Sequence, residues 1–383
     1  MKYVDEFRDP AKAKAILNEI QSLLTKTAIV KQRPLQIMEF CGGHTHTIFR
    51  YGIEKLLPET IEMVHGPGCP VCVLPRGRVD DALSLAERDN VIFTTFGDAM
   101  RVPGSQKSLL QAKADGADIR MVYSPLDALN LARKHPDKQV IFFALGFETT
   151  MPSTALTILQ AEKQAIENFS LFCNHITTAP TIKAILDEPD MILDGFLAPG
   201  HVSMVIGKQP FEFIAEHYHK PIVITGFEPL DILQSIWMVV QQISAQRSTV
   251  ENQYARVAKA SGNLPGLQAI QQVYELDASS ELRGLGKLDH SGVKIRDDYQ
   301  QFDAEKKFAL TKHAASDPAE TCCGDVIKGL MRPWQCHAFG NSCKPETPLG
   351  ALMVSSEGAC AAYYNFGNVN ELLARRQKDT VNS

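Results

Sequence analysis

Short apolar runs rich in β-branched residues alternate with amphipathic stretches along the chain up to Asp231. The runs start roughly 20 to 30 residues apart, which is the repeat of a strand followed by a helix in a parallel sheet. They are apolar on both faces, as strands covered by helices on each side must be. The predicted strands are Leu35–Phe40, Ile61–His65, Val91–Phe96, Ile119–Tyr123, Val140–Leu145, Ser170–Cys173, Gly195–Ala198 and Pro221–Thr225.

This pattern predicts an α/β fold with two related four-stranded parallel-sheet domains, at 35–137 and 138–231. After Asp231 the periodicity becomes helical, in Ile232–Ile243 and Asn252–Ala260, and no strand-like run follows. Segment 284–298 is a charged, Gly-rich connector. We therefore expect 232–383 to form a third, mostly helical and loop domain, packed with an N-terminal helix within 1–34.

The composition excludes several classes of protein. A chain of 383 residues with 44% hydrophobic content can bury a full core. The net charge of −5 and the lack of a long basic run argue against nucleic-acid binding. No window approaches the roughly 18 apolar residues of a membrane helix, and the N-terminus has no secretory signal pattern. We expect a cytoplasmic protein, in a compartment where thiols stay reduced.

Each predicted strand ends in a short polar loop, and such strand ends are where open α/β sheets bind ligands. Ordinary turn chemistry explains any one Gly/Pro loop, but less easily a whole set that carries thiols, imidazoles and carboxylates. The strand-end loops are CGGHTH, GPGCPVC, GDAMRVPGS, SPLDA, GFETT, NHITTAP, PGHVS and GFEPLD. The candidate residues in Gly-flanked loops are Cys41, His44, Cys69 and Cys72, with Glu148, His201 and Glu357 as weaker candidates.

The C-terminal cysteines are the strongest chemical signal. Clustered cysteines in a reducing compartment indicate metal or redox chemistry rather than disulfides. Four thiolates supplied by loops satisfy a [4Fe–4S] cluster, whereas the paired CxxC knuckles of a four-thiolate zinc site are missing there. Cys322 and Cys323 compete for one ligand position, and the glycine after Cys323 favours Cys323. The predicted ligands are Cys323, Cys336, Cys343 and Cys360.

Two further motifs carry thiols. Cys69-Pro-Val-Cys72 is a CxxC, which can close a disulfide or share a metal. No second knuckle lies nearby in the sequence, so redox chemistry or transient metal binding outranks structural zinc. Cys41 and His44 lie three residues apart across two glycines and could ligate one metal. For His44 a ligand or proton-transfer role and a structural role remain equally open.

These motifs resemble the HypD family, the scaffold proteins of [NiFe]-hydrogenase maturation. The matching segments run in the expected order from about residue 35 to residue 365. One departure is Thr321-Cys322-Cys323, where family members often have two cysteines around one residue. The segments are MEFCGGHTH, HGPGCPVCV, FGDAMRVPGS, GFETTMP, APGHVS, GFEPLD, CGDVIKG, the C-x6-C pair and SSEGACAAYY.

The resemblance implies two related α/β domains around a cleft in which Fe(CN)2CO is assembled transiently. It implies Cys41 as the iron ligand, Cys69 and Cys72 as the redox pair, and the four C-terminal cysteines as ligands of a [4Fe–4S] cluster. It also implies three partners: a small HypC-type chaperone that adds its own N-terminal cysteine, a HypE-type cyanide donor and, indirectly, the hydrogenase large subunit.

We therefore expect a metallocentre-assembly scaffold with thiol redox activity rather than a conventional enzyme. The alternative from another class is a stand-alone iron–sulfur-dependent disulfide reductase, since a CxxC and a cluster fit that function too. Only the scaffold explains a third thiol, Cys41, in its own Gly-rich loop. A radical enzyme is a weaker alternative because CxxxCxxC is absent.

Overall fold

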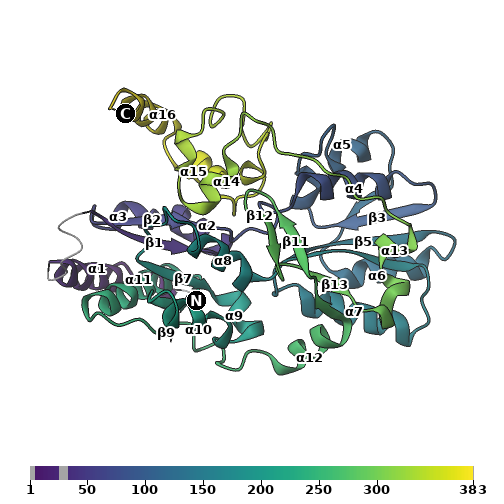
Figure 1. Cartoon of the computed structure of the whole chain (residues 1–383), viewed down its shortest axis with the longest axis horizontal. Helices are drawn as coiled ribbons and strands as arrows, with labels where there is room; N and C mark the ends of the chain where they lie inside the picture. The colour runs from purple at the N-terminus through teal and green to yellow at the C-terminus, as the bar shows by residue number, and fades with distance from the viewer. Residues whose placement is uncertain (1–4, 26–32, 383) are drawn as a thin grey trace.

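The computed structural model describes residues 5–25 and 33–382. Two parallel sheets form separate lobes, with the cysteine-rich C-terminal segment above and between them (Figure 1). The first sheet has the order β2-β1-β7-β8-β9 and the second the order β4-β3-β5-β6. The expectation of an α/β protein with two parallel sheets is confirmed.

The first sheet is covered on its outer face by two long helices that pack on each other, α1 and α11. Helix α1 begins at Pro10 because Asp9 accepts a hydrogen bond from the Ala11 N–H at 2.8 Å, and proline is favoured at the first helical position. The strands are β1 (Leu35–Glu39), β2 (Ile61–His65), β7 (Gly195–Pro199), β8 (Ile222–Thr225) and β9 (Val250–Asn252). The helices of this lobe are η1 (Asp5–Phe7), α1 (Pro10–Leu24), α2 (Gly42–Arg50), α3 (Ile53–Leu56), α8 (Thr178–Leu186), α9 (Gly200–Ile206), η4 (Gln209–Phe211), α10 (Glu212–Glu216) and α11 (Pro229–Ser244).

The second sheet is built from one continuous stretch of chain. Its strands are β3 (Val91–Thr95), β4 (Ile119–Met121), β5 (Gln139–Gly146) and β6 (Phe169–His175). Its helices are α4 (Arg76–Ala86), η3 (Asp98–Arg101), α5 (Leu109–Ala114), α6 (Pro125–Lys134), α7 (Met151–Lys163), α12 (Leu264–Val273), η5 (Asp297–Phe302) and α13 (Ala304–Lys307). The eight predicted strands are all present, with ends that differ by a few residues at most.

The chain does not fill the sheets in the order that the strand repeat suggested. It leaves the first sheet after β2, builds all of the second sheet, and returns for β7 to β9. Strand β1 pairs with both β2 and β7, with Ile37 opposite Met63 on one side and Gly195 on the other. The expectation that the first four strands form one sheet and the next four another is therefore wrong. A strand–helix repeat has the same period whichever sheet receives the strand, so the repeat alone cannot decide the pairing.

The segment after Asp231 is less helical than expected. Helix α11 is confirmed, but residues 252–260 form the end of β9 and turns instead of a helix. Two antiparallel ribbons follow, β10 (Tyr274–Leu276) with β13 (Val293–Ile295) and β11 (Ser279–Leu282) with β12 (Gly286–Asp289). The N-terminal helix α1 packs on α11 over the first sheet. Residues 1–4 and 26–32 of the predicted N-terminal segment lie outside the described residues.

The C-terminal segment consists of short helices joined by loops. These are α14 (Cys323–Lys328), η6 (Pro333–Gln335), η7 (Ala351–Met353), α15 (Ala359–Phe366) and α16 (Val369–Asn382). One buried apolar cluster runs from the first sheet through the second sheet into this segment, and includes Met38, Phe143 and Leu352. The cysteine-rich segment is therefore packed as part of the main core.

Candidate functional site

A cavity of about 330 Å³ lies where the carboxyl ends of the two sheets face each other. From the first sheet it is lined by the loops after β1, β2 and β7, and from the second by the loops after β3 and β5. In each sheet the strand order reverses at one place, between β1 and β7 and between β3 and β5. Ligands bind at such switch points in open α/β sheets. The cavity joins the switch points of both sheets.

The two cysteine-bearing loops CGGH and GPGC pack closely against each other at this cavity. A Cβ at Gly68 would lie 2.3 Å from the backbone nitrogen of Cys41, so only glycine fits there. The Gly42 N–H donates to the Gly68 carbonyl at 3.1 Å. A Cβ at Gly42 would in turn lie 2.4 Å from the Cβ of Glu357. The glycines of CGGH and GPGC thus allow three loops to meet with Cys41 between them.

A buried carboxylate, that of Glu39, holds the Cys41 loop in place. It was not among the candidate residues predicted from the sequence. Its Oε2 accepts the Cys41 N–H at 2.8 Å, and its Oε1 lies 2.7 Å from Nδ1 of His65. The Thr45 hydroxyl also donates to Oε1. Glu39 is fully buried at the end of β1. A carboxylate near the carboxyl end of the mainly apolar run LQIMEF is the signal that could have found it.

Cys41 begins helix α2 and lines the cavity. Burial raises the pKa of its thiol, and the negative charges of Glu39 and Glu357 raise it further. The backbone N–H groups of Gly43 and His44 hydrogen-bond the sulfur and act in the opposite direction. The thiol therefore keeps its proton at neutral pH until a cation replaces that proton.

An aromatic ring separates the two predicted histidines. Phe227 stacks on His201 with ring centroids 3.8 Å apart, and His44 lies on its other side at 4.8 Å. Nε2 of His44 is 3.1 Å from the Thr225 carbonyl, while its buried Nδ1 has no hydrogen-bond partner among the described residues. Burial lowers the pKa of both imidazoles, so both are neutral at neutral pH. His201 lines the cavity, and His44 does not.

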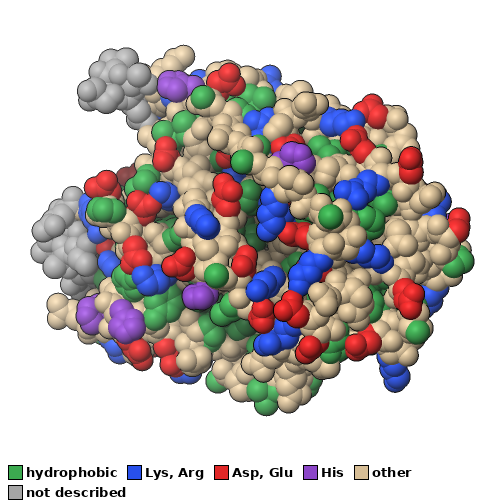
Figure 2. All heavy atoms as spheres, turned by 45° about the vertical axis from the view of Figure 1, so that its right-hand side comes forward, with side chains coloured by type: hydrophobic (Ala, Val, Ile, Leu, Met, Phe, Trp, Pro, Cys, Tyr) green, Lys and Arg blue, Asp and Glu red, His purple; other side chains and the backbone are tan. Residues whose placement is uncertain are grey.

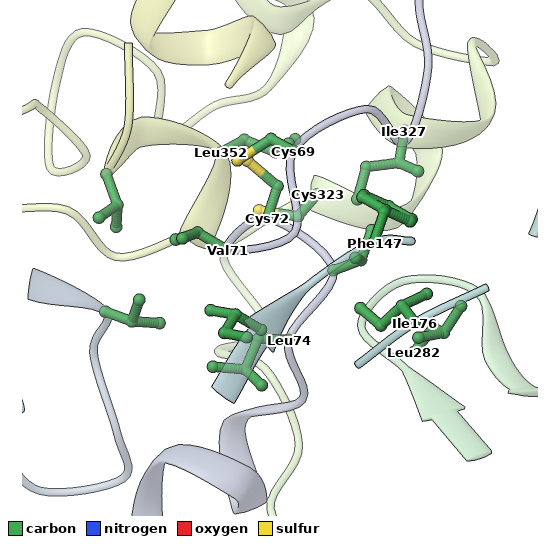
Figure 3. Packing of buried hydrophobic residues seen from close by; sticks show 14 of the residues in the cluster. Cys69, Val71, Cys72, Leu74, Phe147, Ile176, Leu282, Cys323, Ile327 and Leu352 are labelled. Atoms are coloured by element: carbon green, nitrogen blue, oxygen red, sulfur yellow. The ribbon is translucent and has the colours of Figure 1, made fainter. Parts of the chain in front are cut away.

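Cys69 and Cys72 lie between the cavity and the C-terminal segment. Cys69 lines the cavity, whereas Cys72 packs on the other side, with its sulfur 3.9 Å from the Ala351 carbonyl. Burial raises the pKa of Cys72 well above its ordinary value, and a hydrogen bond to Cys69 adds to this. The negative charges of Cys360 and Glu357 also act on Cys72. Figure 3 shows Cys69 and Cys72 grouped with Cys323 and Leu352.

The C-terminal cysteines gather around one small pocket, of about 10 Å³, with apolar neighbours such as Phe339 and Leu352. Burial raises the pKa of Cys360, and the negative charges of the other four thiols raise it further. Cys322 hydrogen-bonds Cys336, while Cys323 is more deeply buried, with a pKa raised to about 12 mainly by burial. The five lining cysteines are Cys322, Cys323, Cys336, Cys343 and Cys360.

This five-cysteine pocket has a donor set that suits an iron–sulfur cluster. Four or more thiols in an apolar setting, supplied by separate loops, match what such clusters use. In their present positions, no three Cys, His, Asp or Glu side chains among residues 5–25 and 33–382 form a group that could hold a single metal ion. Both Cys322 and Cys323 line the pocket, so its geometry leaves the choice between them open.

The weaker candidates have different surroundings. Glu357 lines the cavity, and burial raises the pKa of its carboxyl, as do the charges of Asp98 and Glu39. Glu148 does not line the cavity. Its two oxygens accept the Thr178 N–H at 2.8 Å and the Thr178 hydroxyl at 2.6 Å, which ties its loop to the start of α8.

Two further observations concern the rest of the molecule. Over the face shown in Figure 2, Lys and Arg side chains lie among Asp and Glu side chains. Of the helices in the described part of the chain, none is both long and apolar enough to span a membrane.

Fold and site together define a two-sheet α/β protein with two thiols in its cavity, Cys41 and Cys69, the second of them part of a dithiol, and with a separate pocket of cysteines. The chain belongs to the family described as "HypD: Hydrogenase formation hypA family", whose model matches residues 11–367. The resemblance inferred from the motifs is thereby confirmed.

Curated relatives are similar over nearly their whole length. "Hydrogenase maturation factor HypD" of Rhodobacter capsulatus is 60% identical over 371 residues, which are 96% of this chain and 98% of that protein. The protein of the same description from Escherichia coli (strain K12) is 54% identical over 366 residues, with 96% and 98% covered. "Hydrogenase expression/formation protein HupD" of Azotobacter chroococcum is 48% identical over 373 residues, with 96% and 97% covered.

Proposed function

We propose that this protein is a hydrogenase maturation factor that holds iron in its inter-sheet cavity while cyanide and carbon monoxide ligands are installed. Family membership and the names of close relatives support the maturation role. One observation carries the scaffold mechanism. Cys41 and Cys69 meet in one cavity, and Cys72 turns from that cavity towards the five-cysteine pocket.

Cys41 is proposed as the protein's ligand to this iron substrate. A soft thiolate suits low-spin Fe(II) with CN and CO ligands. Because the isolated thiol is protonated, iron binding must displace a proton, and Glu357 in the same cavity can receive it. Glu39 holds the Cys41 backbone in place through its hydrogen bond to the N–H.

The Cys69–Cys72 pair is proposed to exchange two electrons by opening and closing a disulfide. The five-cysteine pocket is proposed to hold a [4Fe–4S] cluster through Cys323, Cys336, Cys343 and Cys360. A cluster in that pocket would supply one-electron transfer. Cys72 lies within electrostatic range of Cys360, which supports electron transfer between the pair and a cluster in the pocket.

The partners follow from the same role. A small HypC-type chaperone is proposed to dock at the cavity and complete the iron site with its own thiolate, and a HypE-type protein to supply cyanide. The hydrogenase large subunit would receive the product indirectly. We place the protein in the cytoplasm, because its nine cysteines are all free thiols and clustered thiols persist in reducing compartments.

The disulfide-reductase alternative is less well supported. A reductase that acts on other proteins needs an accessible attacking thiol. Here Cys69 is 3% and Cys72 1% exposed. A small ligand in the cavity can reach Cys69, but a protein disulfide cannot reach it without a change in the loops.

Infrared spectroscopy of the anaerobically purified complex with a HypC-type partner tests the proposal. Bands from CN and CO on iron are expected in the wild-type complex. Their absence, together with turnover of protein disulfides, would replace the scaffold with the reductase.

A further inference from the structure

Arg283 is a buried arginine to which none of the roles above assigns a task. It lies at the turn between β11 and β12 and is 4% exposed. A guanidinium keeps its charge at all ordinary pH values, and a buried charge is costly unless anions surround it. Its Nε is 2.9 Å from Oδ1 of Asp317, yet neither Nε nor Nη1 is aligned with a hydrogen-bond acceptor among the described residues. The guanidinium thus has donors to spare.

The backbone fixes Arg283 between the two thiol regions. Its N–H donates to the carbonyl of Val73, the residue after Cys72, at 2.8 Å. The next residue, Gly284, has a φ of +79°, and a Cβ there would lie 2.6 Å from the Cα of Gly324. The hairpin turn therefore packs backbone to backbone against the residue that follows Cys323. Only glycine at both positions allows this approach.

Arg283 interacts electrostatically with a thiol of the five-cysteine pocket, Cys323, and with a thiol of the dithiol, Cys72. Burial lowers the pKa of its guanidinium, while negative charge on Asp317, Cys323 and Cys72 raises it. In Figure 3 the Cys72 and Cys323 side chains lie in one group, whereas Leu282 of the hairpin lies beside Ile176, beyond Phe147.

We propose that Arg283 is the buried countercation for negative charge in the five-cysteine pocket, and that it links this charge to the Cys72 thiol. The inference rests on the iron–sulfur role proposed above for the pocket. A nearby positive charge stabilises negative charge in an apolar pocket, and Arg283 is a buried cation with a spare Nη1 donor, in a hairpin that packs against the residue after Cys323. It acts through the cysteines, as a positioning residue rather than a ligand.

The measurable consequence is a reduction potential. When dithionite, a one-electron reductant, delivers one electron, the pocket becomes more negative by one charge and no bond is formed or broken. A positive charge nearby favours that reduced form. Arg283→Met keeps the length of the side chain and removes its charge, so reduction should become harder. We expect at least a tenfold shift of the equilibrium towards the oxidised form, which is about 59 mV for one electron.

Three further variants define the test. Arg283→Lys keeps the charge and should retain most of the wild-type potential. Lys287→Met removes the same charge from an exposed position of the same hairpin and should leave the potential unchanged. Asp317→Asn removes the carboxylate that partly neutralises Arg283, so the potential should move the opposite way, towards easier reduction. Potentials are measured by anaerobic titration followed by electron paramagnetic resonance, with iron content determined for every variant.

The outcomes separate this inference from the proposed function. A wild-type protein without an iron–sulfur signal contradicts the proposed function itself. A wild-type signal whose potential is the same in Arg283→Met contradicts only the role of Arg283. If Arg283→Met holds no iron, Arg283→Gln, which keeps polar donors without the charge, decides: harder reduction supports the countercation, and an unchanged potential overturns it.

Discussion

The cavity and the five-cysteine pocket differ in almost every property that governs metal binding. The cavity has about 330 Å³ of space, walls from both sheets, and carboxylates of Asp98 and Glu357 beside its thiols. The pocket has about 10 Å³ and is lined by thiols and mainly apolar side chains from one segment of chain. Space and acid–base groups suit a substrate that must enter, react and leave. Crowded thiols in an apolar setting suit a group that stays.

The dithiol connects these two regions. Cys69 belongs to the cavity wall, and Cys72 packs against the loop that leads to Cys360. A Cβ at Gly358 would lie 3.1 Å from the Cys72 sulfur, so this loop approaches the thiol as closely as glycine allows. Changes that leave this dithiol in place and are confined to one region should leave the other region intact, and this can be tested.

The largest effect is expected in the pocket. Cys336→Ala or Cys343→Ala should abolish the iron–sulfur signal, because each removes a thiolate that the site cannot replace from water. Iron content and visible absorbance of anaerobically purified protein measure this. Cys173→Ala is the matched control, since Cys173 lies in β6 with its thiol hydrogen-bonded to the Val293 carbonyl at 3.4 Å. Full iron content in both pocket variants would show that the group is held elsewhere.

The adjacent pair needs its own comparison. Cys323 is the deeper of the two, and Cys322 shares a hydrogen bond with Cys336. We expect Cys323→Ala to lose the signal and Cys322→Ala to retain most of it. The reverse result would assign the ligand to Cys322.

The next effect belongs to the cavity alone. Cys41→Ala should erase the CN and CO infrared bands of the partner complex, yet leave the iron–sulfur signal and the two countable thiols of Cys69 and Cys72. His44→Ala should weaken the bands less, by about 10- to 100-fold in iron affinity at most, because residues behind a ligand adjust a metal site and do not create it. Bands of wild-type strength in Cys41→Ala would mean that another group holds the iron.

The strands and the chemistry of the loops could be predicted from local sequence, whereas the way the sheets assemble could not. Apolar runs such as Val140–Leu145 predict a buried strand, whichever strands it pairs with. The pairing of β1 with β7 depends on contacts between residues about 160 positions apart, as in Ile37 with Gly195, and no local pattern encodes it. The small strands β9 to β13 were missed because three or four residues are too few to show a period.

Within the site, motifs identified the thiols but not their supports. Cys41, Cys69 and Cys72 stand out because glycine and proline surround them. Glu39 and Arg283 lie next to ordinary residues and gain their importance only through burial. Glu148 shows the opposite case, since a Gly-flanked carboxylate suggested chemistry and the structure finds it hydrogen-bonded to Thr178.

Glycine contacts distinguish the two regions at a smaller scale. Gly68→Ala would place a Cβ 2.3 Å from the Cys41 backbone nitrogen, and Gly350→Ala would place one 2.4 Å from the Cys323 sulfur. Backbone cannot yield without moving the loop, whereas a sulfur on a short side chain can rotate. We expect Gly68→Ala to lower the free energy of unfolding by about 1–3 kcal/mol, and Gly350→Ala by less.

Denaturant unfolding measures both glycine variants, with Gly266→Ala in helix α12 as the control. A Cβ there would lie no closer than 3.3 Å to any neighbour. Gly68→Ala should also weaken the CN and CO bands, and Gly350→Ala should lower iron retention in the pocket. Equal losses of both signals in both variants would show that the two regions are not independent.

The smallest effect concerns acid, and it tests a buried imidazole that lies behind the cavity wall. His175, at the end of β6, lies 3.4 Å from the Thr150 hydroxyl of the cavity wall and 2.9 Å from the Thr154 hydroxyl. Burial lowers the pKa of His175 to about 4, from an ordinary 6.5. Between these two pKa values His175 is protonated in the unfolded chain but not in the folded chain. The free energy of unfolding therefore falls as the pH falls from 6.5 towards 4. The shift corresponds to about 3 kcal/mol when complete.

His175→Gln should remove that part of the pH dependence of the free energy of unfolding, measured by urea unfolding across this range. His217→Gln, at an exposed position, should keep it. An unchanged slope in His175→Gln would mean that the imidazole is already protonated in the folded protein.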